Sequence, residues 1–186
     1  MEIEEIKSIY EKAYALLEDV TPFEYDCGQL CGAACCGVSD DGIVSTEEES
    51  DFIYLLPGEE CMHDRGYDTF TWTEVISDGE SYPYTRKGTT CYILRCKGPA
   101  NCRRDKRPMQ CRTYPLWPYI DADGRVEVIY SPVETEYICP IIENEPEIDE
   151  RFYNALLAAW QLLIQIPDVR HMVEVMSREI DAAYED

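Results

Sequence analysis

Ten cysteines in 186 residues, accompanied by only two histidines, restrict what this chain can fold into more than any other feature. The thiols are clustered, and the first group has the spacing Cys27-x3-Cys31-x3-Cys35-Cys36. The opening residues, MEIEEIKSIYEKAYALLEDV, carry acids where a secretory signal peptide carries bases, so we expect no export. Clustered thiols in a reducing compartment indicate metal ligands more often than disulfides. Any metal site here would therefore be built almost wholly from sulfur.

The charge of the chain restricts its partners. There are 38 acidic against 16 basic residues, and the formal net charge is -22. Because a negative field repels phosphate backbones and anionic lipid surfaces, we expect no nucleic-acid and no membrane partner. No stretch approaches the roughly 20 apolar residues that cross a bilayer. These patterns predict a cytoplasmic protein that binds metal ions, and they identify no protein partner.

The basic residues are concentrated in the stretch that carries three of the cysteines. Seven of the 16 lie between positions 95 and 112, and they are Arg95, Lys97, Arg103, Arg104, Lys106, Arg107 and Arg112. Positive neighbours lower the pKa of a thiol and stabilise the thiolate that a metal needs. The alternative is a pocket for a phosphate or carboxylate substrate beside the metal. Charge compensation is the interpretation we favour.

Hydrophobic periodicity predicts helices at both ends of the chain. Apolar residues recur at steps of three and four from Ile3 to Leu17, and again from Phe152 to Ile166. Pro167 suits the first position of a further helix, whose apolar side includes Met172 and Met176. We expect these methionines to pack in a core.

The middle of the chain shows strand and turn patterns. Residues 68–94 are rich in Tyr, Thr, Trp and Val, which favours strands and hairpins. The Asp123-Gly124 pair predicts a second hairpin between PLWPYI and RVEVIY. The run that begins Ser45-Thr46-Glu47-Glu48 is typical of a capping box and predicts a short helix through about Leu55. The sequence therefore predicts one α+β domain over 1–186, in which an irregular cysteine-bearing region at 25–140 is flanked by helices at 1–20 and 147–184.

The first cysteine segment permits two conformations. On a helix, Cys27, Cys31 and Cys35 would share one face, but the glycines between them equally favour a turn-rich loop. Adjacent Cys35 and Cys36 point in different directions in either case, so a single tetrahedral metal rarely takes both. The pair favours two neighbouring centres, or one ligand with a supporting thiol.

Soft sulfur ligands suit zinc, an iron–sulfur cluster or Cu⁺. Eight clustered cysteines suffice for two four-sulfur sites, which leaves Cys61 and Cys91 as small core residues. The ferredoxin run C-x2-C-x2-C-x3-C is absent, which weighs against a low-potential electron carrier. His63 lies near Cys61, and we interpret it as a surface histidine rather than as a ligand.

These motifs together resemble a known family. The run CGQLCGAACCG, then PGEE, then C-x5-C-x4-RP-x2-CR-x-YP-x2-P and a late CP are similar to the YkgJ-like cysteine-cluster family of zinc- or iron-chelating proteins, which includes a domain of flagellin lysine N-methylases. The resemblance covers about residues 25 to 140. It implies a metal site whose ligands are Cys27, Cys31, Cys35, Cys36, Cys96, Cys102, Cys111 and Cys139.

Two features qualify this assignment. The chain has one extra residue in each of the first two gaps of the family's C-x2-C-x2-CC core, and Cys91 is an alternative to Cys96 as a ligand. Arg107 and Arg112, which match the RPxxCRxYP box, are expected to lie against the negative charge of the bound group. The same arginines could instead pair with Glu59 or Glu60.

Three functions are compatible with this pattern. The first is a protein in which cysteine-bound zinc or an iron–sulfur cluster organises the middle region, since the motifs include no catalytic base or nucleophile. The second is metal handling, as a buffer or sensor. The third is a metal-dependent enzyme resembling flagellin lysine N-methylase, a possibility that rests on the resemblance alone. We favour the first.

Overall fold

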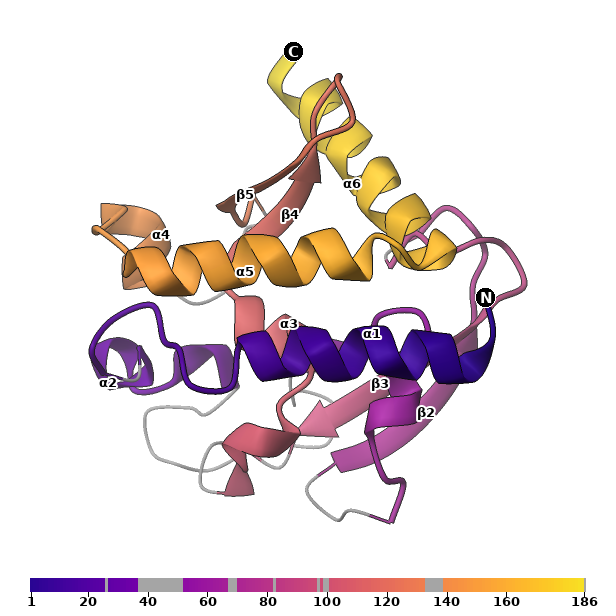
Figure 1. Ribbon diagram of the computed structural model, residues 1–186, viewed down its shortest axis with the longest axis horizontal. Coiled ribbons are helices and arrows are strands. Elements are labelled where there is room, and N and C mark those ends of the chain that lie inside the picture. The colour runs from indigo at the N-terminus through magenta and orange to yellow at the C-terminus, as the bar shows by residue number, and fades with distance from the viewer. Residues whose placement is uncertain are drawn as a thin grey trace.

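The computed structural model describes residues 1–25, 27–36, 52–66, 70–81, 83–96, 98, 101–132 and 139–185. Long helices lie at the two ends of the chain, and short strands and single helical turns lie between them (Figure 1). The fold is α+β, as the sequence predicts. Within the described ranges, no helix combines the length and the apolar character that a bilayer span requires.

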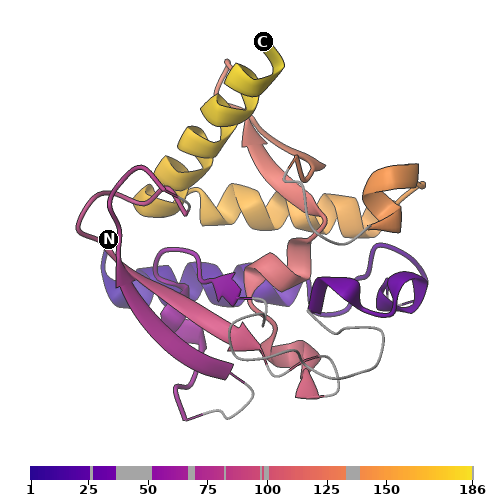
Figure 2. The same ribbon diagram turned by 180° about the vertical axis from the view of Figure 1, so that it is seen from behind.

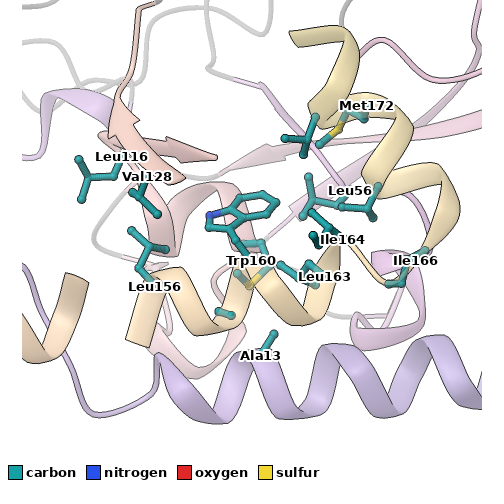
Figure 3. Close-up of a cluster of buried hydrophobic side chains, with 14 of the residues drawn as sticks. Ala13, Leu56, Leu116, Val128, Leu156, Trp160, Leu163, Ile164, Ile166 and Met172 are labelled. Atoms are coloured by element: carbon teal, nitrogen blue, oxygen red, sulfur yellow. The ribbon is translucent and has the colours of Figure 1, made fainter. Parts of the chain in front are cut away.

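The N-terminal and C-terminal helices form the main core. Helix α1 (Ile3–Leu16) packs against α5 (Glu150–Leu163), and the two run in opposite directions (Figures 1 and 2). Helix α6 (Pro167–Glu185) then turns away from α5. The buried side chains repeat at helical spacing on each element, which is why these segments form helices. Ala13 on α1 and Leu156, Trp160 and Leu163 on α5 belong to one buried cluster, in which Ala13 points from α1 toward α5 (Figure 3).

A β-hairpin covers the opposite side of α5 and contacts α6. Strands β4 (Leu116–Ile120) and β5 (Val126–Tyr130) are antiparallel, and the turn between them has the predicted glycine, Gly124, at a φ of 80°. Leu116 and Val128 point from this hairpin into the main core (Figure 3). Met172 and Met176 are buried in the same core, as expected.

A second sheet lies on the other side of α1. It has the antiparallel order β1 (Phe52–Tyr54), β3 (Thr90–Cys96) and β2 (Phe70–Ile76), and the β2–β3 pair confirms the strands predicted there. The short helix predicted through Leu55 is wrong at its C-terminal end, because residues 52–54 pair with β3 instead and Ile53 packs on Leu94. The capping box at 45–48 lies outside the described residues.

The remaining elements are single turns that carry the candidate site. They are α2 (Gly28–Cys31), η1 (Ala34–Cys36), η2 (Glu59–Met62), η4 (Arg104–Lys106), α3 (Met109–Thr113) and α4 (Pro140–Asn144). Each is too short to be stable alone, because nucleating a helix costs more free energy than the hydrogen bonds of a single turn contribute. Their positions therefore depend on contacts with the rest of the molecule.

Candidate metal centre

The first cysteine segment is not a continuous helix; it is a series of turns, the second of the two conformations that the sequence permits. Helix α2 ends at Gly32, and Gly32 and Ala33 both adopt left-handed backbone angles, with φ of 63° and 61°. The chain then enters η1, which carries Cys35 and Cys36. Glycine at position 32 lowers the cost of this reversal, since it has no side chain to clash. The result is a compact turn that carries four cysteines, Cys27, Cys31, Cys35 and Cys36.

The other thiols of this turn act on the pKa of Cys35. A hydrogen bond with Cys36 raises the pKa of the Cys35 thiol, and burial and the charges of Cys36, Cys27 and Cys31 raise it further. Each thiolate formed here makes the next one harder to form, because like charges repel. A full set of thiolates in this turn therefore needs a compensating cation.

The second cysteine segment, which carries Cys96, Cys102 and Cys111, meets the first segment at a cavity. Cys27 and Cys111 both line it, and the cavity has a volume of about 40 Å³. Arg104, Arg107 and Arg112 line it as well, and no acidic side chain is among the described residues around it. The fold thus places thiols from two distant parts of the chain beside one basic cluster.

Arg107 contacts a candidate ligand directly. Its Nε donates a hydrogen bond to Sγ of Cys102 over 3.2 Å. The contact places a cationic donor against one of the candidate ligand sulfur atoms.

Arg112 has a structural role in the same region. Its guanidinium donates to the backbone carbonyls of Arg104, Asp105 and Arg107, and it stacks over the ring of Tyr14 at 4.3 Å. Burial lowers its pKa, although the charges of Tyr14 and Glu59 act in the opposite direction. Arg112 therefore fixes the loop from 104 to 107 onto α1.

Fewer contacts are described for the remaining candidate ligands, Cys96 and Cys139. Cys96 is the last residue of β3, and its side chain lies outside the described part of the structure. Cys139 is the N-cap residue of α4, which lies at the same end of the molecule as α2 in both views (Figures 1 and 2). No described hydrogen bond joins Cys139 to the other candidate cysteines.

Cys61 and Cys91 lie apart from this arrangement. The Cys91 thiol is buried within the three-stranded sheet, 3.1 Å from the hydroxyl of Thr85. Cys61 lies in η2 against the main core, and burial raises the pKa of its thiol to about 11. Both environments are typical of cysteine as a small apolar residue.

The donor chemistry of the region fits a soft metal, whereas a complete ligand set is not assembled. Among the residues that the structure describes, no three Cys, His, Asp or Glu side chains converge closely enough to hold a metal ion. The nine cysteines with described side chains are present as thiols. If a metal binds, its ligands must move from the positions seen, or include the side chain of Cys96. A closed site of four thiolates would then supply free energy of folding.

A buried acidic residue, Glu59, contacts the start of α3, the short helix that carries Cys111. Glu59 has an exposed fraction of 0% and accepts hydrogen bonds from the hydroxyl of Tyr14 and the backbone N–H groups of Leu56 and Met109. In the described contacts Glu59 pairs with these donors rather than with an arginine, and Nε2 of His63 lies 3.9 Å from its Oε1. Glu59 and Arg112 instead meet indirectly, through Tyr14.

His63 belongs to the same network, and the interpretation of it as a surface residue is wrong. Its side chain is 3% exposed, and its Nε2 lies 3.1 Å from the hydroxyl oxygen of Tyr14. The Tyr14 hydroxyl donates to Glu59 over 2.6 Å, so His63, Tyr14 and Glu59 form one hydrogen-bonded group. A single histidine in a polar stretch carries no sequence signal of burial, whereas Tyr14 does follow Tyr10 by four residues on the buried side of α1.

Comparison of the chain with family models, curated proteins and solved structures gives no match.

Proposed function

We propose that this chain is a metal-binding protein whose clustered cysteines hold zinc or an iron–sulfur cluster. The proposed ligands come from the turn at Cys27 to Cys36 and from Cys96, Cys102, Cys111 and Cys139. The observation that carries the proposal is the shared cavity, which Cys27 and Cys111 line together with three arginines. Thiols that serve only as core residues have no reason to collect beside guanidinium groups.

Charge supports this assignment. Four thiolates on one divalent ion leave a formal charge of about -2. Arg107 already donates to Cys102, and the cavity brings Arg104 and Arg112 to the same place. In a chain of net charge -22, this basic lining offsets the charge that the thiolates would add. The resemblance to the YkgJ-like family points to the same function and is part of the proposal.

A second candidate is metal handling, as a buffer or sensor. Cys35 is exposed, and the other described candidate ligands are partly exposed rather than buried. A metal bound at such thiols can exchange with solvent or with another protein more easily than one in a closed core. Slow exchange of bound zinc with added isotopically labelled zinc would favour the first function, and fast exchange would favour the second.

The proposal is tested by replacing one ligand from each segment. Cys27→Ser and Cys111→Ser are each expected to weaken metal binding by at least about tenfold, because removing even an outer support of a ligand costs about 10- to 100-fold. Metal content of anaerobically purified protein is measured by elemental analysis, and affinity by competition with a chromophoric chelator. Visible absorption separates an iron–sulfur cluster from colourless zinc.

Cys61→Ser is the matched control. Cys61 is also a partly exposed cysteine, but it lies in η2 and outside the proposed ligand set. We expect this variant to bind metal as the wild type does. Equal losses in all three variants, or wild-type protein that takes up no metal, would refute the proposal.

A further inference from the structure

We propose that Glu59 is a positioning residue for the metal centre, which holds α3 so that Cys111 and Arg112 face the cysteine turn. This inference rests on the proposed function. It names a residue that binds no metal itself and acts through the peptide that carries a ligand. The evidence is the set of contacts around one fully buried carboxylate.

The contacts of Glu59 require a hydrogen-bond acceptor at each of its two oxygens. Its Oε1 accepts hydrogen bonds of 2.6 Å from both the Met109 N–H and the Tyr14 hydroxyl, and its Oε2 accepts one of 2.9 Å from the Leu56 N–H. A backbone N–H can only donate, so both ends of the side chain must accept. A glutamine would turn an NH₂ group toward either Leu56 or Met109 and lose at least one of these bonds.

The bond to Met109 fixes the position of Cys111. Met109 is the first residue of α3, and Cys111 and Arg112 both donate their N–H groups to the carbonyl of Pro108 at the start of the same turn. Because these bonds join the five residues of α3, we expect the Met109 N–H and the Cys111 thiol to move together. Displacing its first N–H therefore displaces the Cys111 thiol at the wall of the cavity.

A second route leads from Glu59 to Arg112. Tyr14 donates to Glu59 from one side, and its ring carries the Arg112 guanidinium at 4.3 Å. Arg112 in turn holds the carbonyls of the loop from 104 to 107, which includes the residue that contacts Cys102. Glu59 is thus joined to two candidate ligands, to Cys111 through α3 and to Cys102 through Tyr14 and Arg112.

Burial of this carboxylate needs an explanation beyond packing. Removing an ionised group from water is costly, and apolar residues of similar volume usually stabilise a core at least as well. Residues that orient metal ligands typically form hydrogen bonds of this kind, and their loss weakens metal affinity by about 10- to 100-fold. A positioning role accounts for a buried acid at the point where η2 meets α3.

The test compares Glu59→Gln with Glu60→Gln. Both substitutions remove one negative charge from the same turn, but no described hydrogen bond joins the Glu60 side chain to α3. We expect Glu59→Gln to bind cobalt(II), used as the spectroscopic probe, about 10- to 100-fold more weakly. We also expect its sulfur-to-cobalt charge-transfer and d–d bands to shift, since the Cys111 thiol is displaced. Glu60→Gln should match the wild type in both readouts.

The outcomes separate this inference from the function beneath it. Wild-type protein that binds no cobalt would overturn the proposed function. Wild-type binding together with an unchanged affinity and spectrum in Glu59→Gln, even at lower thermal stability, would overturn only the positioning role. If Glu59→Gln does not fold, Tyr14→Phe removes one donor to Glu59 and leaves the carboxylate in place. Weaker cobalt binding by folded Tyr14→Phe would support the inference, and unaltered binding would contradict it.

Discussion

Gly58 and Glu59 are adjacent residues whose identities are fixed by contacts with α1. Gly58 has a φ of 87°, and a Cβ built on it would lie 2.7 Å from Cγ2 of Ile6. The carbonyl of Pro57 accepts a hydrogen bond from the Tyr10 hydroxyl, and Glu59 accepts one from Tyr14. Residues 57–59 therefore contact one face of α1, and this contact places Glu59 within hydrogen-bond distance of Met109 at the start of α3.

Replacing Gly58 tests this close approach. Gly58→Ala should destabilise the protein in two ways, by about 1–2 kcal/mol for a left-handed residue with a side chain and by about 1–3 kcal/mol for the overlap with Ile6. Ile6 cannot swing aside easily, since β-branched side chains in helices keep one rotamer. The free energy of unfolding is measured by urea denaturation.

Gly88→Ala is the control for backbone strain. Gly88 has a φ of 86°, nearly that of Gly58, but a Cβ there would meet no atom within 4 Å. We therefore expect Gly88→Ala to show only the loss of about 1–2 kcal/mol that comes from the left-handed backbone, without the loss from steric overlap. Equal losses in the two variants would mean that the contact between Gly58 and α1 does not matter for stability.

Residue types with a distinctive local pattern could be predicted, and those defined by distant partners could not. The clustering of thiols and arginines is visible in the sequence, and the cavity brings Cys27 and Cys111 together with the expected Arg107 and Arg112. The burial of Glu59 depends on Met109, which is 50 positions away along the chain. No local pattern marks an acidic residue whose hydrogen-bond donors come from three separate segments.

At the scale of elements, the contact between β4 and α6 shows how a buried polar group joins two elements. The Ile120 N–H donates to the hydroxyl of Ser177 over 2.9 Å, and that hydroxyl donates to the carbonyl of Val173. Ser177 is 3% exposed. A second bond between the same elements, from the Tyr119 hydroxyl to Asp181, is exposed to solvent.

These two hydrogen bonds should contribute differently to the free energy of unfolding. Ser177→Ala leaves the buried Ile120 N–H without its acceptor, which should lower the free energy of unfolding by about 1–3 kcal/mol. Tyr119→Phe removes the exposed bond, whose groups can bond to water instead, so we expect a loss of less than about 1 kcal/mol. Urea denaturation of both variants provides the comparison. A larger loss in Tyr119→Phe would show that burial does not set the value of these bonds.

Elements with a repeating apolar pattern or a recognisable turn could be predicted from the sequence, whereas short segments without either could not. The helices α1, α5 and α6 and the β4–β5 hairpin follow from periodic apolar residues and an Asp-Gly turn. Helix α4 was not predicted, and residues 52–54 form β1 where a helix was expected. Such short segments take their conformation from their neighbours, and Ile53 becomes a strand residue because it pairs with Leu94.

At the scale of the whole molecule, α1 separates two layers that serve different purposes. One side of α1 contacts α5, and the other side contacts η2 and faces the three-stranded sheet (Figure 1). The large apolar core lies on the α5 side, together with α6 and the hairpin. Among the described residues, the sheet has a small core of Ile53, Leu55 and Leu94, against which Cys111 packs. The side of the molecule that holds Cys111 therefore has the greater need of a bound metal to fix its structure.

X-ray absorption at the metal edge of the anaerobically purified wild-type protein tests the central claim most directly. Our account predicts a first coordination shell dominated by sulfur, at about 2.3 Å if the metal is zinc. That shell should lose sulfur scatterers in Cys111→Ser and keep them in Cys61→Ser. A shell made only of nitrogen and oxygen, at about 2.0–2.2 Å, would contradict the assignment of these cysteines as ligands.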